Sequence, residues 1–103
     1  METIELLRDT LLKLRQSSMN IRSEKDLRNV MESYDMLFLG ENFNRIYARE
    51  LHHYMKKKLG LSLPHEEFLD LIPGVCDGLN MPYETLVFLN NPSKRADYQI
   101  TLF

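Results

Sequence analysis

The spacing of apolar residues changes along this chain, and that change limits the folds it can adopt. From residue 3 to residue 72, large apolar side chains recur every three to four positions, which is the period of a helix with one buried face. Near the C-terminus, Tyr98, Ile100 and Leu102 alternate with polar residues, which is the period of a strand with one buried face. The sequence therefore predicts a helical body followed by β structure.

Two helices are expected before residue 41. The first covers residues 3–16, with an apolar stripe at Ile4, Leu7, Leu11 and Leu14 that Ser17 and Ser18 interrupt. The second begins near Glu24, because the side chain of Ser23 can cap the free amides of a helix start. It is expected to end at Gly40, since glycine readily adopts the left-handed conformation that closes a helix. Its predicted buried residues are Leu27, Val30, Met31, Tyr34 and Leu37.

Two more helices are expected between residues 42 and 72. The longer one runs from Asn42, a favourable N-cap, to Leu59, with Gly60 at its C-terminus. A shorter helix opens at Ser62 to Pro64 and ends at Ile72, because Pro73 disfavours the helical conformation in the residue before it.

The segment from residue 75 to residue 103 has two interpretations. Residues 75–84 are irregular in pattern, and residues 82–89 fit either a helix or a strand. We favour a strand at 85–89, a turn at 90–96 that is rich in Asn, Pro and Ser, and a second strand at 97–103. The expected fold is a mainly α, four-helix single domain of residues 1–103, with a C-terminal β-hairpin on the third helix and a winged-helix-like arrangement as one possibility.

Composition assigns the chain to ordinary globular proteins. It has 103 residues, enough for one domain, with 44% apolar and 27% charged side chains. It contains no apolar run of membrane-spanning length, and its N-terminal residues lack the pattern of a secretion signal. The single cysteine, Cys76, cannot form an internal disulfide and is expected to be a small buried apolar residue. These features favour a cytoplasmic location.

Charge is distributed unevenly along the sequence. Residues 63–84 hold five acidic side chains and no Lys or Arg, whereas residues 41–62 hold five basic and two acidic side chains. An acidic segment of this kind can pair within the chain or attract a basic protein partner. The candidate protein-interaction residues are Glu66, Glu67, Asp70, Asp77 and Glu84.

Nucleic-acid binding is the alternative function. In winged-helix proteins the last helix enters the major groove and the hairpin contacts the DNA backbone, and Lys94 and Arg95 would lie near the tip of such a hairpin. The acidic segment argues against this function, because Lys and Arg supply most of the affinity for phosphates. The candidate phosphate contacts are Arg45, Arg49, Lys56, Lys57, Lys58, Lys94 and Arg95.

Catalytic and metal-binding motifs are weakly represented. His52, His53, His65 and Glu66 match no zinc-ligand spacing, so a metal protein or small hydrolase is only a minor hypothesis. Cys76 lies between Gly74 and Gly78 without an evident general base, and no phosphate-binding glycine loop occurs. We therefore expect no cofactor and no catalytic site.

The expected function is that of a small non-enzymatic interaction or regulatory module that binds a protein partner or a second copy of itself, with no membrane contact. If the final strand, which runs to Phe103, has an unpaired edge, that edge can accept a strand from a partner or from a second copy. We favour the alternative, in which the hairpin caps the helical core and its edge is protected.

Overall fold

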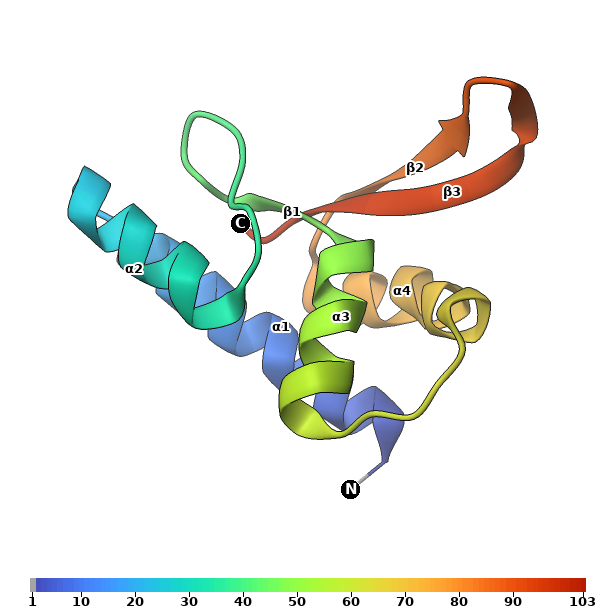
Figure 1. Ribbon diagram of the computed structural model, residues 1–103, viewed down its shortest axis with the longest axis horizontal. Helices are drawn as coiled ribbons and strands as arrows, with labels where there is room; N and C mark the ends of the chain where they lie inside the picture. Colours follow the sequence, from blue (N-terminus) through green and yellow to red (C-terminus); the bar gives the residue numbers. More distant parts are fainter. Residues whose placement is uncertain (1) are drawn as a thin grey trace.

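Four helices and three strands make up the part of the chain that the structure, a computed structural model, describes, residues 2–103. The sheet lies on one side of the helices, and two of its strands project beyond them as a long hairpin, the wing (Figure 1). The elements are α1 (Thr3–Met19), α2 (Glu24–Tyr34), β1 (Arg45–Tyr47), α3 (Ala48–Leu59), α4 (His65–Leu79), β2 (Tyr83–Phe88) and β3 (Asn91–Thr101).

The sheet is antiparallel, with the strand order β1-β3-β2. The predicted C-terminal hairpin is confirmed, although β2 begins at Tyr83 and the turn is shorter than expected. The pairing of β2 with β3 is irregular on either side of Val87. The last strand is not an edge of the sheet, because β1, from the middle of the chain, pairs with the far side of β3. Of the two alternatives for the last strand, the protected one is therefore confirmed.

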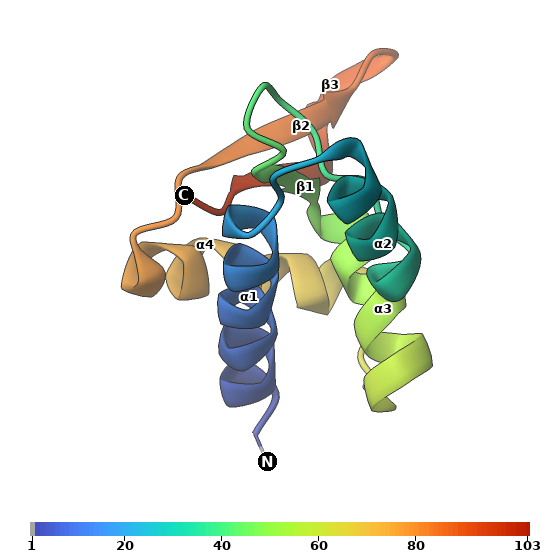
Figure 2. The ribbon, with the colours of Figure 1, turned by 90° about the vertical axis from the view of Figure 1, so that its left-hand side faces the viewer.

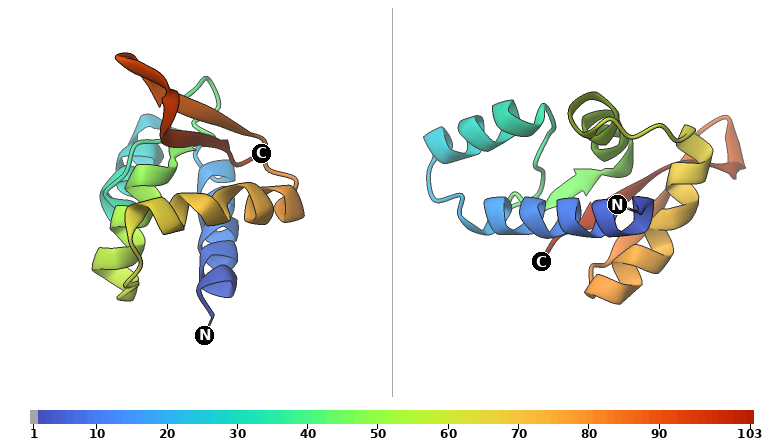
Figure 3. Two further views of the ribbon diagram at one scale, coloured as in Figure 1. Left: turned by 90° about the vertical axis from the view of Figure 1, so that its right-hand side faces the viewer. Right: turned by 90° about the horizontal axis from the view of Figure 1, so that it is seen from below.

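The run β1, α3, α4, β2 and β3 has the winged-helix-like layout, with α4 in the position of the recognition helix. Helix α4 crosses α1 below the sheet (Figures 2 and 3). Buried side chains from α1, α3, α4 and the sheet form one cluster. It includes Leu7, Leu11 and Leu14 of the predicted stripe, whereas Ile4, the first residue of that stripe, is 51% exposed. No helix within residues 2–103 combines the length and apolar character needed to cross a bilayer.

Helix α1 is longer than its sequence pattern indicated. It continues through Ser17 and Ser18 to Met19 because both hydroxyls have partners outside the helix. The Ser17 hydroxyl lies 2.9 Å from the hydroxyl of Tyr34, and Ser18 donates a 2.6 Å hydrogen bond to the carbonyl of Phe43.

Helix α2 begins as predicted and ends earlier than predicted. The amide of Asp26 donates to the Ser23 side chain, which confirms the N-cap. The helix stops at Tyr34, because Asp35 adopts a left-handed conformation. Met36 and Phe38 are then buried, whereas Leu37, predicted to be buried, is 49% exposed. Gly40 does have a positive φ, but it serves the turn between Leu39 and Arg45 rather than a helix end.

The segment expected to be one helix from Asn42 onward contains a strand and a helix. Residues 45–47 pair with residues 99–101 of β3, and the side chain of Asn44 donates to the carbonyl of Phe103. Helix α3 begins only at Ala48 and ends at Gly60 as predicted. The prediction failed because the partners of β1 lie more than fifty residues away in the sequence.

Helix α4 continues through Pro73, where the sequence predicted a stop. It starts after Pro64 and ends at Leu79, with Asn80 in the left-handed conformation. Pro73 removes one helical N–H donor, but residues on both sides of it share one buried face. The buried residues of this helix are Phe68, Leu69, Ile72, Val75 and Cys76.

Candidate interaction surfaces on α4 and the wing

Helix α4 collects four of the five acidic candidate residues. Glu66, Glu67, Asp70 and Asp77 are all exposed on it. Glu84 lies apart on β2, where it lines a small hollow together with Arg45 of β1. In the position that a recognition helix occupies, this protein therefore presents negative charge.

Arg95 of β3 is bound to this acidic helix. Its Nη2 atom lies 3.0 Å from Glu66 Oε2 and 2.9 Å from Asp70 Oδ1, and its guanidinium group lies 5.6 Å from the centre of the Tyr98 ring. Its hydrogen bonds, first to the Tyr98 hydroxyl and then to Glu66, raise the pKa of Arg95 above its ordinary value. The side chain is only 25% exposed. The contact ties the wing to α4 and leaves little of this cation free for a phosphate.

The other basic candidates are scattered. Arg45 lies on the sheet, Lys94 on the wing, and Lys56 to Lys58 at the C-terminal end of α3. Figure 1 shows that end of α3 on the opposite side of the molecule from the wing. Arg49, in the first turn of α3, has an exposed side chain. The structure thus brings no more than a few of these cations to any one face of residues 2–103.

Asp97 joins the base of the wing to α3. Its Oδ1 atom accepts hydrogen bonds from the amide of Arg49 at 2.9 Å and from its own neighbour Tyr98 at 2.8 Å. This carboxylate therefore caps α3, whose N-cap residue Tyr47 makes no side-chain cap. Burial raises the pKa of Asp97. Sequence reasoning missed this role, because the cap comes from a distant strand.

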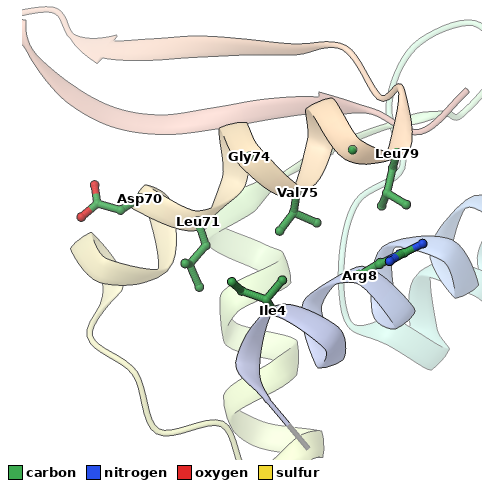
Figure 4. Close-up of a pocket in the computed structure, with 8 residues that line it drawn as sticks. Ile4, Arg8, Asp70, Leu71, Gly74, Val75 and Leu79 are labelled. Carbon is green, nitrogen blue, oxygen red and sulfur yellow. The ribbon is translucent and has the colours of Figure 1, made fainter.

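A groove of about 410 Å³ lies between α1 and α4. Figure 4 shows Ile4, Leu71 and Val75 along it, with Asp70 and Arg8 near its two ends. Gly74 and Gly78 also line it, and a Cβ atom built on either glycine would meet nothing within 4 Å. Two glycines four residues apart on one helix were the signal for this groove. The sequence did not place them on one helix, because Pro73 predicted a helix end at Ile72.

The tip of the wing is apolar and exposed. Val87 is 45% exposed, Phe88 is 42% exposed, and Leu89 is fully exposed. The ammonium group of Lys94 lies 5.5 Å from the centre of the Phe88 ring.

The candidate metal-binding histidines contact other residues of the protein. His52 is buried, with Nδ1 3.1 Å from Nδ1 of His65 and Nε2 2.8 Å from the carbonyl of Leu63. Its ring stacks on Phe68, and burial lowers the pKa of His52. His53 points elsewhere, toward Asp35. Within residues 2–103, no three side chains of metal-binding type converge.

Cys76 is buried in α4, as predicted. Burial raises the pKa of its thiol to about 12, so the reactive thiolate is strongly disfavoured near neutral pH.

Comparison of the chain with protein-family models, with curated proteins and with solved structures found no match.

Proposed function

We propose that this protein is a non-enzymatic interaction module that binds a basic, amphipathic helix of a partner protein in the groove between α1 and α4. The observation that carries the proposal is an apolar groove bordered by the acidic face of α4. Helix-in-groove recognition needs an apolar floor for the stripe of the bound helix and polar contacts at its margins.

The floor of the groove supports this kind of partner. Ile4, Leu71 and Val75 provide apolar surface, and Ile4 is 51% exposed in the free protein. Gly74 and Gly78 have no side chains, so a bound helix can approach the backbone of α4 closely. A volume of about 410 Å³ accommodates several side chains of the bound helix rather than a whole domain.

The margin of the groove supports a basic partner. Asp70 lines the groove, and Glu67 lines an adjoining hollow that shares Ile4 and Leu71 with it. Asp77 lies about two helical turns beyond Asp70 on α4. Arg95 neutralises part of the charge of Glu66 and Asp70, while Glu67 and Asp77 make no ion pair within residues 2–103. Lys or Arg residues on the flanks of the bound helix would complement these carboxylates.

A peptide titration followed by amide NMR spectra tests the proposal. The probe is a synthetic peptide with leucines at helical spacing and lysines on its other face, and the control peptide has glutamates in place of the lysines. We expect the basic peptide alone to shift the amide signals of α1 and α4. Shifts confined to other elements, or equal binding of the acidic peptide, would refute the proposal.

A matched pair of variants sharpens this test. Gly74→Leu places a side chain in the groove from a position where an added Cβ meets no neighbour, so the fold should be retained. We expect this variant to bind the basic peptide at least about tenfold more weakly. Glu32→Leu, an exposed change on α2, is the control and should leave binding unchanged.

Nucleic-acid binding is a second candidate, favoured by the winged-helix-like layout and by the exposed Lys94 on the wing. It is tested by fluorescence anisotropy with labelled single- and double-stranded oligonucleotides over a range of salt concentrations. Phosphate contacts would produce a steep loss of affinity with salt, and Lys94→Glu would weaken binding further. Absence of binding at low salt rules this candidate out.

A further inference from the structure

Strand β2 forms an outer edge of the sheet. It pairs with β3 on one side, and within residues 2–103 no strand pairs with its other side. The wing projects past the helices, which leave this edge uncovered (Figure 1). Proteins usually protect such an edge with charged residues, proline or short strand length. Glu84 is the one charged residue of β2, and residues 85–88 contain neither a charged residue nor a proline.

We propose that this edge binds the same edge of a second copy, so that two β2 strands pair antiparallel about a two-fold axis at Leu86. The choice of a second copy rests on charge complementarity. In this register Glu84 lies opposite Phe88 of the second copy, because antiparallel pairing about residue 86 matches residue 84 with residue 88. Lys94 lies over the Phe88 ring of its own chain, so Glu84 of each copy meets Lys94 of the other.

The remaining pairs in this register are uncharged. Leu86 faces Leu86, and Thr85 faces Val87, while both Val87 and Phe88 lose exposure to water. The association stops at two copies, because each copy uses the same surface in a two-fold symmetric contact. Within residues 2–103 of each copy, the edges left on the joined sheet are the two β1 strands, and a strand of three residues is a poor template for further strands.

Sedimentation equilibrium measures the proposed dimer. A single-strand contact buries a small area, so the protein is studied at the high concentrations of an NMR sample. We expect the wild-type mass to rise from 12.2 kDa toward twice that value with increasing concentration. A mass that stays at that of the monomer overturns the proposal.

Charge exchange identifies the surface. Glu84→Lys alone and Lys94→Glu alone each turn two symmetry-related attractive pairs into repulsive ones, and each should raise the dissociation constant about tenfold. The double variant Glu84→Lys/Lys94→Glu restores both attractive pairs and should restore dimerisation. Glu32→Lys on α2 is the control and should not change it. A dimer that is insensitive to the single changes, or that the double variant does not restore, overturns the proposal.

Discussion

Replacing Gly74, which lines the groove between α1 and α4, with alanine should stabilise the protein against unfolding. Gly74 lies in the interior of the 15-residue helix α4, where glycine costs about 1 kcal/mol relative to alanine. Its φ is not among the positive values, and an added Cβ would meet nothing within 4 Å. No contact among residues 2–103 therefore offsets the gain in helix propensity, and the free energy of unfolding should rise by about 1 kcal/mol.

The corresponding rise in melting temperature follows from the size of the chain. An unfolding entropy of about 2.1 cal/mol/K per residue gives roughly 0.2 kcal/mol/K for a domain of this length, so about 1 kcal/mol corresponds to about 5 °C. Thermal and urea unfolding followed by circular dichroism measure both quantities.

Gly60→Ala is the matched control for this prediction. An added Cβ at Gly60 also meets nothing within 4 Å, but Gly60 closes α3 with a φ of 70°. Alanine is strained in that conformation, so this variant should lose about 1 kcal/mol. A lower melting temperature for Gly74→Ala, or a shift of the same sign for both variants, would refute the reasoning.

Three further predictions concern single side chains. Arg95→Ala should lower the free energy of unfolding, because it removes the ion pairs with Glu66 and Asp70. The loss should be only about 1 kcal/mol, because both carboxylates are largely exposed, and Lys94→Ala should change the free energy of unfolding much less in the same urea titration. The pKa of His52 is lower in the native state than in the unfolded chain, so below about pH 6.5 the unfolded chain binds a proton more readily than the native protein does. The free energy of unfolding should therefore fall as the pH drops below about 6.5, by at most about 1.4 kcal/mol per pH unit. His52→Gln should flatten this pH dependence in unfolding titrations, whereas His53→Gln should preserve it. Cys76 should react with a thiol reagent only at the rate of unfolding, and rapid labelling of the native protein would contradict its burial and raised pKa.

The sequence was most informative where structure depends on near neighbours. The stripe at Leu7, Leu11 and Leu14 gave α1 its buried face, and Ser23 capped α2 through an amide three residues away. Gly60 ended α3, and the alternation around Ile100 indicated a strand. Each of these signals arises from backbone geometry or from the repeat of one element, which a short window of sequence contains.

The candidate site was only partly predictable. The acidic character of α4 followed from counting charges along residues 63–84, and the exposure of that helix then placed four carboxylates on one surface. The contact of Arg95 with Glu66 and Asp70 was not predictable, because it joins residues 25 and 29 positions apart through the fold of the wing. The groove was missed because Pro73 suggested that α4 ends before Gly74.

The sequence by itself determined a helical body, a C-terminal hairpin and an acidic segment, since periodicity, capping and charge are local properties. The tertiary structure alone decided that residues 45–47 form a strand, that α4 continues past Pro73, and that β3 is central and leaves β2 as an edge. The physical reason is the same in each case. The backbone groups of β1 are satisfied by β3, and the burial of Val75 and Cys76 keeps α4 helical, so partners distant in sequence outweigh the local preference.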